Sequence, residues 1–264
     1  MRALAILLLA LLTAGGALGQ SRLDRLTQRD DLFGWEAVGR LDIGQAGYCT
    51  GVLIAPDQVL TAAHCVFDGT RAPVPAESLR FRAGLRDGVA VAESGVSGYA
   101  VAEGYDPARG MVPGNVRRDA ALLRLATPIP SAVAAPFALH GAPAPGQRVS
   151  LVSYGRDRDE APSWQRDCGM LWRQGGLMAF DCNVIFGSSG APVFARTASR
   201  ARILSLVSGG TTEGRRVAFG MDLPGLVEAL RRDLRARGIR QAVPGFRRES
   251  VGQGRASGAR FARP

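Results

Sequence analysis

Two adjacent serines lie in the stretch FGSSGAPVF, residues 186–194, between glycines and ahead of an apolar run. Because Gly, Ser and Pro gather in turns for backbone reasons alone, the stretch by itself predicts only a turn. Gly187 and Gly190 permit a sharp turn that exposes Ser189, and the backbone N–H groups of Gly187 and Ser189 can then converge on one oxygen as an oxyanion hole. A nucleophilic Ser189 also needs a base and an acid that orients the base, which must come from elsewhere in the chain.

The chain has two histidines, and His64 is the candidate base. It lies in the segment LTAAHC beside Cys65, and Cys49 precedes that cysteine by sixteen residues. A disulfide between the two would fix the backbone beside the imidazole, and acid–base catalysis depends on fixed geometry. Asp119 begins the apolar segment DAALLRL, where a carboxylate can be held against an imidazole. A core histidine beside a disulfide and a turn aspartate before a strand are the structural alternatives, and the second histidine, His140, is expected on the surface.

The cysteines form an even set of four, Cys49, Cys65, Cys168 and Cys182. Such sets form disulfides in proteins that reach an oxidising compartment. Four cysteines allow three pairings, and we predict the sequence-near one, Cys49–Cys65 and Cys168–Cys182, which closes short loops. A zinc site of four thiolates is the alternative, but the chain has no C-x-x-C pair to support it.

The N-terminus is typical of a secretory signal peptide. Residues 1–19, MRALAILLLALLTAGGALG, contain an arginine, then an apolar run, then small residues. The apolar run is short for a membrane span, so we predict cleavage after Gly19 and a secreted or periplasmic chain without a transmembrane segment. The polar residues 20–35 are predicted to be an N-terminal segment or a pro-segment.

The net charge of +10 comes mostly from the C-terminal end of the chain. All 33 basic residues are arginine, and ten of them lie in residues 231–264 beside only two acids. We predict residues 238–264 to be an Arg-rich, disordered tail. Contact with a polyanion through this tail is a secondary interpretation. Specific binding of nucleic acid is not expected, and the chain is expected to be a monomer.

The body of the chain consists of short apolar or alternating runs, such as GVLIA, LRFRAG and RILSLVSGG, separated by Gly, Pro and Asp turns. This spacing predicts an all-β barrel or sandwich. Residues 126–147, rich in Pro and Ala, are predicted to connect two halves. One helix is expected in DLPGLVEALRRDLRARG, where apolar residues recur every three to four positions, Asp222 can cap the start and Gly238 would end the helix.

The segments LTAAHC, DAALLRL and GSSGAP, in that order, resemble the three signature segments of trypsin-like (chymotrypsin-fold) serine proteases. The order histidine, aspartate, serine differs from that of subtilisins and of α/β-hydrolases. The resemblance covers about residues 36–237 and implies an all-β fold of two six-stranded antiparallel β-barrels, with the active site between them and a C-terminal helix. It also implies a peptidase domain that acts as an endopeptidase through an acyl-enzyme, without cofactor or metal.

The resemblance implies a role for each residue of the three segments. His64 would be the general base, Asp119 the acid that orients it, and Ser189 the nucleophile that attacks the peptide carbonyl. The backbone N–H groups of Gly187 and Ser189 would form the oxyanion hole.

The resemblance also implies substrate-binding residues. The segment LVSGG stands where the family has the strand that pairs with the substrate backbone, so Ser208, Gly209 and Gly210 are expected to line the cleft. Asn183 stands near the position of the specificity-pocket base. No acid is evident there to select Lys or Arg, and Val207 stands where glutamyl-specific relatives carry a histidine.

Ser188 departs from the family's usual signature. The family has an acid just before the nucleophile, which in animal enzymes pairs with a newly freed N-terminus. The chain also lacks an Ile-Val-Gly-Gly start, so activation by insertion of the N-terminus is not expected. A serine at this position resembles the bacterial, glutamyl-endopeptidase-like branch. The departure keeps one alternative open, a catalytically weak binding protein of the cell envelope with a protease fold.

Overall fold

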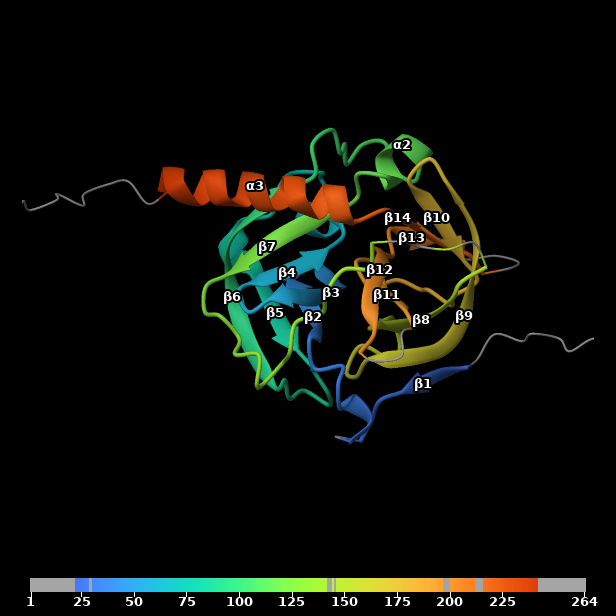
Figure 1. The fold of residues 1–264 in the computed structure, drawn as a ribbon. Coiled ribbons are helices and arrows are strands. Elements are labelled where there is room, and N and C mark those ends of the chain that lie inside the picture. The colour runs from blue at the N-terminus through green and yellow to red at the C-terminus, as the bar shows by residue number, and fades with distance from the viewer. Residues whose placement is uncertain are drawn as a thin grey trace, which may run out of the picture.

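The computed structural model describes residues 22–28, 30–141, 144, 146–196, 200–211 and 216–241. The predicted signal peptide and residues 242–264 of the predicted Arg-rich tail lie outside these residues. Two units built from β-strands lie side by side, and the long helix α3 (Pro224–Gln241) crosses one of them (Figure 1). None of the helices in the described ranges combines the length and the apolar character that a membrane span requires.

The first unit is a closed antiparallel barrel. Its strands follow one another around the barrel in the order β2-β3-β4-β7-β6-β5. Their bounds are Val38–Ile43 (β2), Gly47–Ala55 (β3), Gln58–Thr61 (β4), Leu79–Ala83 (β5), Ala92–Val101 (β6) and Ala121–Leu125 (β7). Phe81 fills the interior and is fully buried. It fits there because Gly39 has no side chain, since a Cβ at Gly39 would lie 2.5 Å from the Phe81 ring.

The second unit is a strongly curled sheet with the order β12-β11-β8-β9-β10-β14-β13, and β1 adds to β9. The bounds are Leu23–Arg25 (β1), Arg148–Ser153 (β8), Ser163–Gln174 (β9), Leu177–Phe180 (β10), Pro192–Ala195 (β11), Arg202–Leu206 (β12), Gly209–Gly210 (β13) and Ala218–Met221 (β14). Only two residues separate β12 from β13, so one run of chain, residues 202–210, borders both ends of the sheet. The predicted all-β fold with a closed six-stranded first barrel is confirmed, but the second unit is an open half-barrel of eight strands and not the predicted closed barrel of six.

Short helices connect the strands. They are η2 (Asp30–Leu32), η3 (Ala63–Val66), η4 (Ala76–Ser78) and α2 (Pro113–Val116). The predicted end of the C-terminal helix is wrong, because α3 continues past Gly238 to Gln241. A glycine inside a helix costs about 1 kcal/mol but does not by itself stop the helix. The carboxylate of Asp222, the predicted cap, accepts hydrogen bonds from Arg173 at 3.1 and 2.8 Å.

Aromatic side chains join the two units. Trp35, just ahead of β2, lies with its ring centroid 5.0 Å from those of Trp164 and Phe194, which belong to the second sheet. Phe137, between β7 and β8, completes the cluster at 4.6 Å from Phe194. Aromatic pairs at such distances add to the stabilisation that burial provides. The two units are thus packed against each other through shared aromatic side chains.

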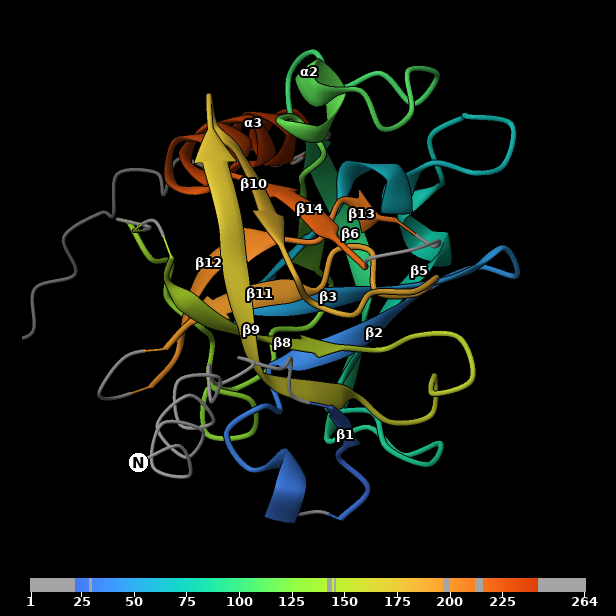
Figure 2. The ribbon, with the colours of Figure 1, turned by 90° about the vertical axis from the view of Figure 1, so that its right-hand side faces the viewer.

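The chain ahead of the first barrel packs on the body. β1 pairs with β9, and Figure 2 shows the two strands next to each other at one side of the second sheet. Leu26 and Leu32 are each 2% exposed. Much of the segment predicted as N-terminal segment or pro-segment therefore contributes apolar contacts, which its removal would expose to water.

Candidate active site

His64 and Asp119 are brought together by strand pairing. β4 and β7 are antiparallel neighbours, with Thr61 opposite Ala121. The residues just after β4 and just before β7 must therefore lie close together. His64 lies in η3, directly after β4, and its Nδ1 is 2.8 Å from Asp119 Oδ2. The backbone N–H of His64 also donates to Asp119 Oδ1 at 3.0 Å, so both carboxylate oxygens hold the same residue.

Asp119 is 3% exposed and has a third donor. The hydroxyl of Ser208 donates to Asp119 Oδ2 at 2.5 Å. Because an ionised carboxylate only accepts hydrogen bonds, the proton of the neutral imidazole lies on Nδ1 and Nε2 can accept. Ser208 was expected to line the cleft. Ser208 lines a smaller pocket that also borders Ser189, and its side chain in addition orients the acid, a contact that no spacing in the sequence could indicate.

Two opposing effects act on the pKa of His64. Burial disfavours the imidazolium and lowers the pKa, whereas the charge of Asp119 and its hydrogen bond raise it. The effect of Asp119 is the larger in sum, so the pKa lies above the ordinary value of 6.5. The pair can accept a proton at neutral pH and hold the resulting cation next to a carboxylate.

Both disulfides have the predicted pairing, Cys49–Cys65 and Cys168–Cys182. The first links β3 to the residue that follows His64, and thereby fixes the backbone that carries the imidazole. The second links β9 to the start of the loop that leads to Ser189. Because a disulfide restricts the conformations of the chain, each stabilises the segment that it closes.

Residues 185–190, here called the serine loop, dock on the first barrel. Gly187 and Gly190 have φ values of 93° and 75°, which favour glycine. A Cβ at Gly190 would overlap Thr61 Oγ1 and the carbonyl oxygen of Thr50. The backbone N–H of Thr50 donates to the carbonyl of Ser189 at 2.8 Å, and its hydroxyl donates to that of Gly187 at 2.8 Å. The half-buried Ser189 is therefore held beside the strands that lead to His64.

The peptide that precedes Gly187 has a defined orientation. The carbonyl of Phe186 accepts a hydrogen bond from the backbone N–H of Arg156 at 2.7 Å. In a trans peptide the C=O and N–H point in opposite directions, so the N–H of Gly187 is directed away from Arg156. Within the described part of the chain, the N–H groups of Gly187 and Ser189 donate to no protein acceptor, whereas that of the intervening Ser188 donates to Ile185. These two donors are available to a ligand.

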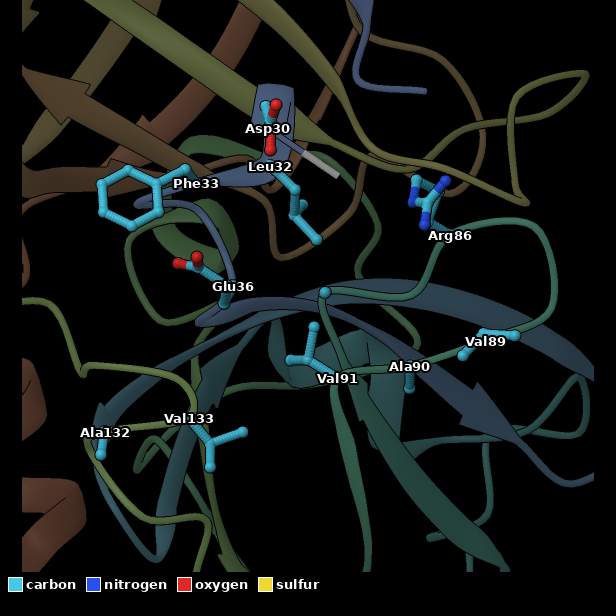
Figure 3. A pocket seen from close by; sticks show the side chains of 11 residues that line it. Asp30, Leu32, Phe33, Glu36, Arg86, Val89, Ala90, Val91, Ala132 and Val133 are labelled. Carbon is cyan, nitrogen blue, oxygen red and sulfur yellow. The ribbon is translucent and has the colours of Figure 1, made fainter. Parts of the chain in front are cut away.

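His64 and Ser189 line the same cleft, of about 690 Å³, together with Gly187, Tyr48 and Arg156. An adjoining pocket of about 220 Å³ is also bordered by Ser189. Its other lining residues are Met111, Val184, Ile185, Phe186, Val207, Ser208, Gly209 and Gly210. A separate cavity of about 880 Å³ beside η2, shown in Figure 3, is lined by none of the three predicted catalytic residues.

Two sequence-based expectations need correction. Asn183 lines neither the cleft that contains His64 nor the adjoining pocket beside Ser189. Its backbone N–H donates instead to Gln165 Oε1 at 2.7 Å. Its neighbour Val184 lines the smaller pocket instead. His140, expected on the surface, is half-buried, and its backbone N–H donates to the carbonyl of Ile203 at 2.7 Å.

The chain is similar to known endopeptidases in both sequence and structure. A glutamyl endopeptidase of Bacillus licheniformis is 26% identical over 161 residues, which are 58% of this chain and 47% of that protein. The chain thus matches about half the length of this curated relative. A solved Glu endopeptidase in complex with MPD superposes with a TM-score of 0.68 at 18% identity, covering 83% of this chain and 98% of that one.

Two further solved structures have the same fold. The thermostable serine protease AL20, from an extremophilic microorganism, has a TM-score of 0.61 at 19% identity and covers 74% of this chain and 94% of its own. The protease Anisep of Arthrobacter nicotinovorans has a TM-score of 0.61 at 17% identity, with coverage of 82% and 99%. The family model of the trypsin-like peptidase domain matches residues 49–200, more than half of the chain. With its barrel architecture and this match, the chain belongs to the trypsin-like peptidase family.

Proposed function

We propose that this chain is a serine endopeptidase that hydrolyses peptide bonds through His64, Asp119 and Ser189. The observation that carries the proposal is the contact of Asp119 with both the Nδ1 and the backbone N–H of His64, at 2.8 and 3.0 Å, in a cleft that Ser189 also lines. This contact fixes the tautomer in which Nε2 can act as a base towards a serine hydroxyl.

The proposed reaction has two steps. Ser189 Oγ attacks the peptide carbonyl carbon while His64 Nε2 takes the hydroxyl proton, and the negative oxygen is bound by the N–H groups of Gly187 and Ser189. The C–N bond then breaks, His64 returns its proton to the leaving amine, and an ester on Ser189 remains. Water, deprotonated by His64, attacks this ester; the ester C–O bond then breaks, His64 returns the proton to Ser189 Oγ, and the peptide leaves with a new carboxyl end.

A fluorophosphonate probe tests this function, because it reacts with serines activated by a neighbouring base. We expect one modified site, and peptide mapping by mass spectrometry should locate it at Ser189. The adjacent Ser188 is fully buried and should remain unmodified. Labelling that persists in Ser189→Ala, or that maps to another serine, would contradict the assignment of the nucleophile.

We propose that the chain works in the periplasm or outside the cell. Two disulfides in the described residues support this location, since disulfides persist in oxidising compartments. The apolar leader of residues 1–19 supports it independently.

We further propose that the pocket beside Ser189 accepts an aliphatic side chain as the residue before the scissile bond. Its side-chain walls are Met111, Val184, Ile185, Phe186 and Val207, and none of the described residues that line it is charged. Val184 reaches across the pocket, because a Cβ on Gly210 would overlap its Cγ2. A carboxylate or guanidinium in this space would lose water without gaining a partner, which is strongly unfavourable.

The substrate preference should therefore differ from the one that the name of the Bacillus relative indicates. For peptides that differ only in the residue before the scissile bond, we expect kcat/KM to be roughly 10²-fold higher with Leu, Val or Met than with Glu or Arg. Val184→Ala enlarges the pocket and should shift the preference towards Phe. Equal or better cleavage after Glu in the unmodified protein would contradict an apolar pocket while leaving the catalytic assignment intact.

A further inference from the structure

Arg158 places a half-buried cation behind the serine loop. Its Nη1 donates to the carbonyl of Ser153 at 2.7 Å, and its Nη2 donates to Ser153 Oγ at 3.2 Å and to Ser188 Oγ at 3.1 Å. Among the residues that the structure describes, no carboxylate forms an ion pair with it. Burial lowers the pKa of Arg158 to about 10, so the guanidinium is still charged at neutral pH.

Ser188 is the point at which this cation meets the serine loop. The side chain is fully buried. Its hydroxyl lies 3.2 Å from the carbonyl of Tyr154, to which it donates, and accepts from the backbone N–H of Ile185 at 3.3 Å as well as from Arg158. Hydrogen bonds from a charged donor are stronger than those between neutral groups. The residue between the two oxyanion donors is thus tied to the end of β8.

The Arg158 guanidinium is closely packed between Gly155 and the serine loop. A Cβ at Gly155 would lie 2.7 Å from Arg158 Nη2 and 2.6 Å from Ile185 Cγ2. A Cβ at Gly187 would lie 3.0 Å from Gly155 Cα. The segment after β8 therefore lies directly against the serine loop, and the absence of a side chain at Gly155 creates the space in which Arg158 reaches Ser188.

We propose that Arg158 is a positioning residue, which holds Ser188 so that the N–H groups of Gly187 and Ser189 stay directed at the cleft. This inference rests on the proposed function. The usual family signature has an acid at the position of Ser188, which in animal enzymes pairs with a newly freed N-terminus. Here the cation comes from within the chain and binds a neutral hydroxyl, so the loop takes its active shape without N-terminal insertion.

Kinetics of Arg158→Ala test the inference. We expect kcat to fall roughly 10²-fold, since loss of an oxyanion donor has effects of about 10² to 10³. KM should change by less than about threefold, because the pocket beside Ser189 is unaltered. Affinity for a peptide boronate, whose oxygen occupies the oxyanion hole, should fall by the same factor as kcat, while affinity for the amine-side product peptide, which has no oxygen at this place, should not change. Added ethylguanidinium should restore part of kcat.

Matched variants separate positioning from general destabilisation. Ser188→Ala should lower kcat by a similar factor, and the double variant should be little worse than either single one, because the two residues act through one contact. Arg86→Ala is the control. Arg86 likewise donates to a backbone carbonyl, that of Thr27 at 2.8 Å, but does not contact the serine loop. Its removal should leave kcat within about twofold. Arg158→Met, similar in length, replaces the alanine variant if the latter does not fold.

Three results would overturn the inference. A kcat of Arg158→Ala or Arg158→Met within threefold of that of the unmodified protein would show that the serine loop does not need Arg158 to hold it. This result would leave the proposed function unaffected. A fall in kcat with unchanged boronate affinity would place the effect outside the oxyanion hole. An unmodified protein that reacts with no fluorophosphonate and cleaves no peptide would refute both the proposed function and this inference.

Discussion

Ser189→Ala is expected to lower kcat/KM for peptide hydrolysis by at least about 10³-fold. Without the hydroxyl no acyl-enzyme can form. The residual activity must then come from direct attack of water on the peptide carbonyl bound in the prearranged site. KM should change little, since the side chains that wall the adjoining pocket are untouched. Initial rates with a peptide substrate that ends in a chromophore measure both constants.

The same substitution should leave the fold intact. Ser189 is half-buried, and its carbonyl, which accepts from Thr50, is retained in alanine. We expect the free energy of unfolding to change by less than about 1 kcal/mol. Ser97→Ala is the control for purification and handling, because Ser97 lies on β6, outside the cleft and the adjoining pocket. A Ser189→Ala protein that keeps more than a tenth of the activity would exclude this residue as the nucleophile.

Strand pairing explains why part of this site could be predicted from the sequence. The segments LTAAHC and DAALLRL end and begin neighbouring strands, so their polar residues meet wherever those strands pair. The disulfide pairing followed from short loops, and the glycines of the serine loop followed from turn geometry. These features depend either on residues that are near in sequence or on the register of a single pair of neighbouring strands.

Contacts between distant loops could not be predicted in this way. Ser208 reaches Asp119 across 89 positions, and Arg158 reaches Ser188 across 30. Neither pair shares a strand register, and serine and arginine are both common on surfaces. Asn183 was predicted to bind substrate, but its backbone N–H donates to Gln165, 18 positions away, and the neighbouring Val184 lines the pocket instead. The break between β12 and β13 at residues 207–208 could not be predicted either. Val207 is β-branched and Ser208 is small, and neither residue indicates that a strand ends there.

The helix end shows the opposite error, in which a local signal was given too much weight. Gly238 favours a helix terminus in isolation. However, Val227, Leu230 and Leu234 of α3, and Leu223 just before it, are at most 3% exposed and belong to the same buried apolar cluster as the interior of the first barrel. Packing of this kind stabilises the helix more than one glycine destabilises it.

Asp119→Asn is expected to lower kcat by about 10⁴-fold. An amide can donate as well as accept, so it can hold His64 with Nδ1 as the acceptor and the proton on Nε2. His64 then cannot take the proton of Ser189. The loss should appear in kcat more than in KM, and Asp233→Asn, which removes an exposed carboxylate of α3, should have no comparable effect.

The pH profile distinguishes this mechanism from a loss of structure. Activity needs neutral His64, so it falls as the pH drops through the pKa of that group. In the unmodified protein burial lowers this pKa and Asp119 raises it by more, which places the acid limb of kcat/KM above pH 6.5. In Asp119→Asn the raising effect disappears while burial remains, so the limb should move below pH 6.5. A limb that stays in place, or moves upwards, would mean that Asp119 does not set the protonation of His64.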